Sequence, residues 1–495
     1  LAAHAAEETV VLLKNEGDIL PLAEGTKVAV IGEFAQKPRY QGAGSSLVNP
    51  TKLDTANELL AGMPLQSVGY AQGYQRNNKH DDALKMEAVE LAKKADVVLL
   101  YVGLPEISET EGLDRDHMRM PENQVELLEA VAEVNPNLVV VLAAGSPVEM
   151  PWLDRCKALV HGYLGGQAGA GAVLRVIIGQ VNPSAKLAES YHMTCEENPS
   201  SPYYPGLERT SEYREGLYVG YRYYETAGVP VRFPFGFGLS YTTFAYSDLK
   251  VSEKEVTFTL TNTGKRDGAE VAQLYVGCKD GKVFRPAKEL KGFAKVFLKA
   301  GESKTVTIEL DDKAFRYFDV KTDSWQVEGG VYQLMVGASV ADIRLEGEVT
   351  VQGTGAACPY DPAQLECYYT GKITQVSDAQ FEALLGHPIP ESGWDASGLL
   401  GMNDAICQMY YAKNPLARLV YKILTSLKDK SIAKGEPDLN ILFIYNMPFR
   451  GIAKMTGGAV TMDMARCMVT MVNGHFFKGL GGLIKAFFAG RKAQK

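Results

Sequence analysis

The chain has 495 residues, of which 46% are hydrophobic and 22% are charged, a composition typical of soluble globular proteins. This length suggests about three domains at roughly 100–200 residues each, and it allows cores to form without disulfides or metals. The net charge is −8 and no strongly basic domain stands out, which argues against nucleic acid as a partner. No apolar run approaches the ~18 residues of a membrane-spanning helix, so we expect no transmembrane segment.

Seven cysteines are scattered along the chain, and no CxxC pair occurs. An odd number without such spacing indicates neither a disulfide framework nor a zinc ribbon. The seven histidines are dispersed without an HExxH motif, so we expect no metal site and no cofactor. Reduced thiols are typical of a reducing compartment, and we expect a cytoplasmic protein.

The first residues predict an amphipathic helix over Leu1–Asn15 that is already under way at Leu1. We therefore expect the chain to be processed or to be part of a longer protein. Any signal peptide would then precede Leu1.

From Lys27 to Ser190, short apolar runs rich in β-branched residues alternate with helical stretches. Such strands indicate a parallel sheet covered on both faces, and the right-handed crossover rule makes it a doubly wound α/β sandwich. The predicted strands are 27–31, 66–69, 96–102, 137–143 and 158–163. The predicted helices between them are 53–61, 82–95 and 122–134.

The pattern changes after an irregular linker over 191–234 that is rich in Tyr, Pro and Glu. Short strands of period two, separated by turn signals, predict a β-sandwich of about 100 residues. These strands are 256–260, 270–276, 290–298, 303–310, 331–337 and 343–351. The composition shifts again after Gly353, and helices are expected at 378–385, 399–412, 416–427 and 474–491. The predicted regions are therefore 1–240, the α/β sandwich with its linker; 241–352, the β-sandwich; and 353–495, a mainly helical tail.

Ligands of open parallel sheets bind at the carboxyl ends of the strands, so the loops that leave those ends are candidate sites. The first loop contains the run Gln41-Gly42-Ala43-Gly44-Ser45-Ser46. A dinucleotide fingerprint needs its glycines directly after the strand, which this run does not satisfy. It predicts either a structural loop or one whose backbone N–H groups and hydroxyls line a polar ligand.

The third of these loops is unusually long and acidic, with Glu106, Glu109 and Glu111 followed by Asp114 and Arg115. Nearby carboxylates and partial burial can raise the pKa of one acid until it donates a proton near neutral pH. Arg115 would hold Asp114 and fix the loop. A solvated acidic loop is the alternative interpretation.

Several motifs, taken together in this order, resemble the part of glycoside hydrolase family 3 that follows its catalytic barrel. They are Ala6–Asn15, Val28–Gly32, Gln41–Ser46, Thr110–Arg115, Gly179–Leu187, Glu215–Arg222 and Pro234–Phe244. They cover roughly residues 1–350, and the combination is highly specific. The resemblance implies that the β-sandwich is of the fibronectin type III kind, and it leaves the tail as an appended segment.

The resemblance implies retaining hydrolysis of β-linked sugars, most often β-glucosides, by an Asp nucleophile and a Glu acid/base roughly 5–5.5 Å apart. The family carries the nucleophile in an N-terminal β/α barrel, within a Ser-Asp-Trp segment that this sequence lacks; Asp323-Ser324-Trp325 has a different order and falls inside the predicted β-sandwich. The acid/base belongs to the long acidic loop, where the pattern Glu-Gly-x-Asp-Arg matches Glu111, with Glu109 as the fallback. The implied substrate-binding or loop-positioning residues are Gly44, Ser45, Ser46, Asp114 and Arg115.

We therefore expect a β-glucosidase-like fragment or subunit that acts on carbohydrate once a barrel completes it, in cis or in trans. On this reading the chain alone is inactive, and a homo-oligomer is compatible with the sequence. The alternative is a non-catalytic carbohydrate-binding or scaffold protein derived from the family.

Overall fold

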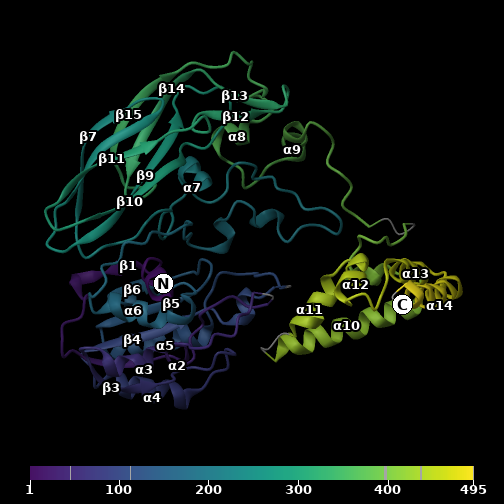
Figure 1. The fold of residues 1–495 in the computed structure, drawn as a ribbon, viewed down its shortest axis with the longest axis horizontal. Coiled ribbons are helices and arrows are strands. Elements are labelled where there is room, and N and C mark those ends of the chain that lie inside the picture. Colours follow the sequence, from purple (N-terminus) through teal and green to yellow (C-terminus); the bar gives the residue numbers. More distant parts are fainter. Residues whose placement is uncertain (45, 112, 395–397, 435–437, 494–495) are drawn as a thin grey trace.

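The computed structural model describes the chain except for residues 45, 112, 395–397, 435–437 and 494–495, with side chains described as far as residue 490. Figure 1 shows an α/β region, a β-sandwich above it, and a group of helices set to one side on an extended segment. The predicted fold classes are confirmed in this order.

The α/β region is built on a six-stranded sheet with the order β1-β6-β5-β4-β2-β3. The strands are β1 (Val11–Asn15), β2 (Lys27–Ile31), β3 (Gln66–Ala71), β4 (Val97–Gly103), β5 (Leu138–Ala143) and β6 (Ala158–His161). Strands β2 to β6 run parallel, and β1 pairs antiparallel with β6. The carboxyl ends of these five parallel strands therefore lie at the same edge of the sheet.

Helices cover both faces of this sheet (Figure 1). One core contains α4 (Asp82–Ala92) and α5 (Glu122–Val134). The other core contains α1 (Ala2–Glu7), α2 (Glu33–Gln36), α3 (Ala56–Leu59) and α6 (Gly169–Ile177). Along β4, alternate side chains enter opposite cores, with Leu100 in the first and Leu99 in the second. This two-sided burial explains why the strand is apolar throughout.

The helix predicted over Leu1–Asn15 is wrong beyond its first turns. Helix α1 ends at Glu7, and residues 11–15 form strand β1. Val11 and Leu13 are buried in one core and Val10 and Leu12 in the other. A short apolar run buried on both faces has no periodicity that separates a strand from a helix, which is why the pattern misled the prediction.

The β-sandwich packs a four-stranded sheet, β10-β9-β14-β15, against a three-stranded sheet, β11-β8-β7, with a hairpin of β12 and β13 beside them. The strands are β7 (Phe244–Val251), β8 (Glu255–Asn262), β9 (Gly268–Cys278), β10 (Glu289–Leu298), β11 (Ser303–Glu309), β12 (Arg316–Asp319), β13 (Ser324–Val327), β14 (Gly330–Gly337) and β15 (Ile343–Val351). Six of these strands were predicted from the sequence, whereas β7 and the β12–β13 hairpin were not. Trp325 lies on the hairpin and is 55% exposed, so the Asp-Ser-Trp sequence is part of the sandwich, as expected.

The linker between the two domains folds back on itself. Tyr191 and Phe233 form an antiparallel bridge, and α7 (Tyr221–Ala227) lies between them. Tyr218 is fully buried against the start of the tail, where α8 (Glu366–Thr370) and α9 (Asp378–Leu385) follow the sandwich.

Arg214 in the linker donates a 2.8 Å hydrogen bond to the Val376 carbonyl and pairs with Asp378 at 2.7 Å. The first part of the tail is therefore fixed to the linker.

The rest of the tail is a separate group of helices with its own small core. They are α10 (Pro415–Ala433), α11 (Leu439–Asn446), α12 (Phe449–Met455), α13 (Met462–Val472) and α14 (Phe476–Ala493). The helix predicted over 399–412 is wrong, because this stretch contains only a 3₁₀ segment over Ile406–Tyr411. Across the described residues, no helix is both long and apolar enough to cross a membrane.

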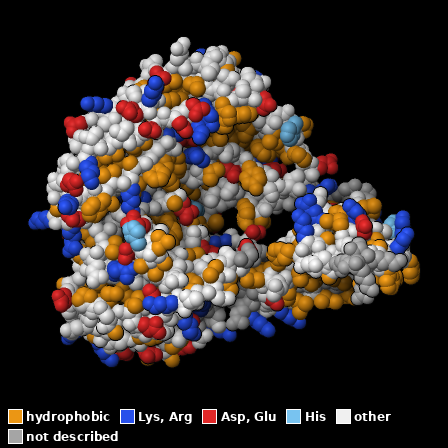
Figure 2. Space-filling view, viewed as in Figure 1, with side chains coloured by type: hydrophobic (Ala, Val, Ile, Leu, Met, Phe, Trp, Pro, Cys, Tyr) orange, Lys and Arg blue, Asp and Glu red, His pale blue; other side chains and the backbone are white. Residues whose placement is uncertain are grey.

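Helix α14 packs closely on α13 through glycines. A Cβ at Gly479 would lie 2.7 Å from the Cys467 carbonyl oxygen, and one at Gly482 would lie 2.8 Å from Cys467 Sγ. The other side of α14 stays open to solvent, with Phe477 85% exposed and Phe488 60% exposed. Figure 2 shows hydrophobic and basic side chains interspersed on the visible face of the tail.

Candidate active site

The chain order of the sheet reverses direction between β2 and β4. From β2 the chain continues to β3 on one side and then crosses to β4 on the other. Ligands of open α/β sheets bind outside the carboxyl ends of the strands at such a switch point. The loops that leave β2 and β4 there are the Gly-rich loop and the long acidic loop, so the topology brings the two predicted site loops together.

Glu109 is clamped at this edge by partners from two other loops. Its carboxylate pairs with Arg39 Nη1 at 2.5 Å, accepts hydrogen bonds from the Gly145 N–H at 3.1 Å, and accepts the Ser146 hydroxyl. The Arg39 side chain is 1% exposed and that of Glu109 is 12% exposed. The same Arg39 nitrogen also donates to the Leu104 carbonyl at 2.7 Å. The clamp therefore joins the loops after β2, β4 and β5.

The surroundings of Glu109 hold its carboxyl in the ionised form. Burial raises its pKa, but the Ser146 hydroxyl, the Arg39 charge and the Gly145 N–H together outweigh burial and leave the pKa below its usual range. The expectation that a glutamate of this loop becomes a better proton donor through neighbouring carboxylates is therefore wrong for Glu109. Glu106 is also paired, with Arg76 Nη1 at 2.8 Å.

Glu111 differs from Glu109 in its exposure to solvent. Its side chain is exposed at the carboxyl edge of the sheet. Its carboxylate lies directly against Gly44, where an added Cβ would stand 2.6 Å from Glu111 Oε2. Gly44 has a φ of +96°, a conformation that L-residues rarely adopt. The structure thus brings Gly44 and Glu111 together from two loops, as their shared edge predicts.

The remaining predicted residues have mixed outcomes. Ser45 lies outside the described residues, and Ser46 is exposed with its Oγ 3.2 Å from the position of a Cβ on Gly42. Arg115 fixes the acidic loop, as expected, but not by holding Asp114. It donates to Ser146 Oγ at 2.7 Å and to the Pro147 carbonyl at 2.8 Å. The prediction of an Arg115–Asp114 contact is therefore replaced by an anchor on the loop after β5.

Three further candidate residues at this edge, Arg39, Ser146 and Glu189, were not predicted from the sequence. Glu189 lies between α6 and the linker. Its pKa is raised to about 7 by burial and by the negative charge of Glu109, against the opposing charge of Arg115. Arg39 and Ser146 both lie in loops at the carboxyl edge, which was the available signal. Their pairing with Glu109 depends on the folded chain.

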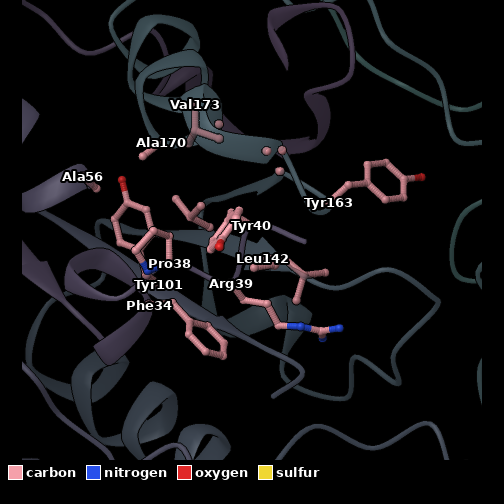
Figure 3. A pocket seen from close by; sticks show the side chains of 16 residues that line it. Phe34, Pro38, Arg39, Tyr40, Ala56, Tyr101, Leu142, Tyr163, Ala170 and Val173 are labelled. Atoms are coloured by element: carbon pink, nitrogen blue, oxygen red, sulfur yellow. The ribbon is translucent and has the colours of Figure 1, made fainter. Parts of the chain in front are cut away.

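A small, mostly apolar pocket of about 50 Å³ lies beside the clamp. Figure 3 shows Phe34, Tyr40 and Tyr101 around it, with the guanidinium of Arg39 extending away from it. Within the described residues, no group of three or more His, Cys, Asp or Glu is placed to hold a metal ion.

Two family models match the chain in this order. Residues 10–241 match the glycosyl hydrolase family 3 C-terminal domain, and residues 270–340 match the fibronectin type III-like domain. The chain belongs to glycoside hydrolase family 3. The second matched region of this family 3 chain ends at residue 340, before the helical tail.

The curated relatives of this family 3 chain carry glycosidase names. It is 49% identical over 365 residues to thermostable β-glucosidase B of Acetivibrio thermocellus, covering 72% of this chain and 48% of the relative. It is 46% identical over 375 residues to an exo-α-(1→6)-L-arabinopyranosidase of Bifidobacterium breve, covering 72% of this chain and 49% of the relative. The chain spans about half the length of these relatives.

A solved structure agrees with this assignment. The crystal structure of a GH3 β-glucosidase from Bifidobacterium adolescentis is similar with a TM-score of 0.70 and 48% identity, covering 73% of this chain and 54% of that one.

Proposed function

We propose that this chain supplies the acid/base side of a retaining β-glycosidase whose nucleophile is carried by a β/α barrel. The proposal rests on the exposed carboxylate of Glu111, which lies at the switch point of the sheet beside a clamped second carboxylate. It is supported by the family membership and by the glycosidase names of the relatives.

Glu111 is a better acid/base than Glu109. The role requires a carboxyl that is protonated when the glycosidic bond breaks and ionised when water attacks. Glu109 accepts hydrogen bonds from Arg39, Ser146 and Gly145 that stabilise its charged form, so it is a poor proton donor. We assign Glu109 as a positioning residue that fixes the loop carrying Glu111.

The proposed reaction proceeds in two displacements. The barrel aspartate attacks the anomeric carbon while Glu111 gives its proton to the departing glycosidic oxygen, which leaves a covalent glycosyl-enzyme. Glu111, now ionised, then takes a proton from the water that attacks the same carbon and releases the sugar. Both steps need Glu111 within hydrogen-bond reach of an oxygen atom, first the glycosidic oxygen and then the attacking water, and its exposed position at the sheet edge leaves it accessible to both.

The substrate is proposed to be a β-glucoside, in line with the name of the relative from Acetivibrio thermocellus. The name of the relative from Bifidobacterium breve makes an α-L-arabinopyranoside the comparison substrate. Aryl derivatives of both sugars distinguish the two, because the barrel-completed enzyme should show the higher kcat/KM on one of them.

The test uses the chain fused behind a family 3 barrel, with Glu111→Ala, Glu109→Ala and Glu106→Ala compared. For Glu111→Ala, substrates with poor leaving groups should lose several orders of magnitude in kcat/KM, since the departing oxygen needs the proton. Aryl substrates with acidic leaving groups should still glycosylate the nucleophile, and azide should rescue the slow second step. Glu106→Ala is the control and should stay near wild type. Azide rescue with Glu109→Ala and not with Glu111→Ala would move the assignment to Glu109.

A further inference from the structure

A second, polar pocket of about 520 Å³ lies between the loops at the carboxyl edge of the sheet and the linker. Pockets of roughly 300–1,000 Å³ are typical of small-molecule sites. Its charged and polar lining includes Arg115, Glu189, His192, Asn198, Glu215 and Arg222.

Four of the lining side chains present buried polar atoms that have no hydrogen-bond partner within the described part of the chain. They are both ring nitrogens of His192, Oε2 of Glu215, Nη2 of Arg115 and Nε of Arg222, the last of which lies 3.5 Å from Glu289 Oε1 in an ion pair. His192 is 7% exposed and Glu215 is 8% exposed. Buried polar groups in proteins are nearly always paired, so a group that pairs with these atoms is expected in the pocket.

The pocket is preorganised by contacts among its lining side chains. The His192 ring stacks on Tyr224 with the ring centroids 5.6 Å apart, and the Tyr221 ring stacks on Phe235 at 4.6 Å. The other terminal nitrogen of Arg115 is held by Ser146 and Pro147. Rigid walls of this kind reduce the conformational entropy that the side chains of the pocket lose when a ligand binds.

The lining discriminates between classes of ligand. A simple anion would face the carboxyls of Glu189 and Glu215, and a simple cation would face the guanidinium groups of Arg115 and Arg222. Hydroxyl groups suit both, because each hydroxyl donates to a carboxylate and accepts from a guanidinium. Burial lowers the pKa of His192, so its neutral ring offers one donor and one acceptor to such a ligand.

We propose that this pocket binds a neutral sugar of one or two rings. The proposal does not depend on the proposed catalytic function, because every residue of the pocket belongs to this chain. Arg115 connects the pocket to the acidic loop, so a bound sugar would order the loop that carries Glu109 and Glu111.

The test is calorimetric titration of the 495-residue chain with D-glucose, cellobiose and L-arabinose, and with inorganic phosphate as the anion control. We expect saturable binding of at least one sugar and none of phosphate. Glu215→Gln, which keeps the size of the side chain, and His192→Phe, which keeps the ring that stacks on Tyr224, should each weaken binding about tenfold or more because buried hydrogen bonds are lost. Glu106→Gln, outside this pocket, should bind as wild type does.

Hydrogen exchange on the wild-type chain keeps the test decisive if a variant fails to fold. The bound sugar should slow exchange in 188–200 and 215–224, which line the pocket. The proposal is overturned if none of the three sugars binds the folded wild-type chain, if phosphate binds in their place, if both folded variants bind as tightly as wild type, or if protection appears only elsewhere in the chain.

Discussion

Arg39 and Glu109 form the most deeply buried ion pair of the site, and the geometry predicts what happens when it is broken. Glu109→Gln keeps the shape of the side chain but leaves the guanidinium of Arg39, which is 1% exposed, without its counter-charge. Removing one partner of a buried pair costs about 3–5 kcal/mol. Urea unfolding should show this loss, whereas Glu106→Gln, in an ion pair whose side chains are 25% and 43% exposed, should cost less than about 1 kcal/mol.

The loss caused by Glu109→Gln should also depend on pH. The folded pKa of Glu109 lies below its ordinary value of 4.5, so its stabilising effect is present above that value and disappears as the pH falls through the lowered pKa. The difference between wild type and variant should therefore shrink in acid. A difference that stays constant into strong acid would contradict the assignment.

Glu189 predicts the opposite pH dependence. Its pKa in the folded chain is raised from 4.5 to about 7, so ionising this group disfavours the folded state. The chain should lose stability from this source as the pH rises from about 4.5 to about 7. Glu189→Gln cannot ionise, and its urea midpoint relative to wild type should rise over this range and level off above it. An equal difference at acidic and alkaline pH would show that Glu189 ionises normally.

Among the structural elements, the contact between α13 and α14 can be tested with two neighbouring glycines. A Cβ at Gly479 would lie 2.4 Å from Met471 Cγ and 2.7 Å from the Cys467 carbonyl, whereas one at Gly481 meets nothing within 4 Å. Gly479→Ala should separate the helices and make the tail sensitive to limited proteolysis. Gly481→Ala should leave the tail as resistant or more so, since Ala favours a helix over Gly by about 1 kcal/mol. Equal sensitivity of the two variants would show that the helices do not pack through Gly479.

Elements were predictable where one periodicity held over their whole length. Strand β2 and helix α5 have the predicted bounds, 27–31 and 122–134. Strand β7 was missed because its register shifts between Ser247 and Lys250, which breaks the alternation of apolar residues. Helices α11 to α13 were also missed, in a part of the chain where no pattern was assigned.

The features of the site that lie within one loop were predictable from the sequence, whereas the contacts between loops were not. The edge of the sheet and the match of Glu111 to the family pattern could be read from the sequence, and Gly44 was expected in the same place. The clamp on Glu109 could not be read, because Arg39 and Ser146 are 70 and 37 residues away along the chain. Long-range pairs of this kind leave no local spacing to recognise.

For the whole molecule, the net charge of −8 is unevenly distributed along the chain, because the tail is basic. Residues 398–495 contain 14 Lys and Arg against five Asp and Glu, which corrects the impression that no part of the chain is basic. The remainder of the chain is correspondingly acidic. Opposite charges on the two parts, together with the exposed apolar residues of the tail, favour association between copies of the chain.

We therefore predict that the chain self-associates through its tail. Sedimentation should show species larger than the monomer, and the double variant Phe477→Ser, Phe488→Ser should shift them toward the monomer without loss of helix content, because both side chains are mostly exposed. Flotation with anionic liposomes tests the competing partner. A monomeric wild-type chain that floats with the liposomes would replace self-association with membrane binding.

The bridge between Tyr191 and Phe233 has a consequence for how this architecture can diverge. This bridge holds the two ends of the linker segment 192–232 side by side, so the segment can lengthen or shorten while the two domains on either side keep their positions. The segment supplies His192 and Glu215 to the polar pocket, and its Glu208 accepts a hydrogen bond from the Tyr411 hydroxyl of the tail. Insertions and deletions in this segment can alter which ligand the pocket binds and how the tail is held, while the two domains stay unchanged. The segment is therefore a suitable place to engineer a new ligand specificity.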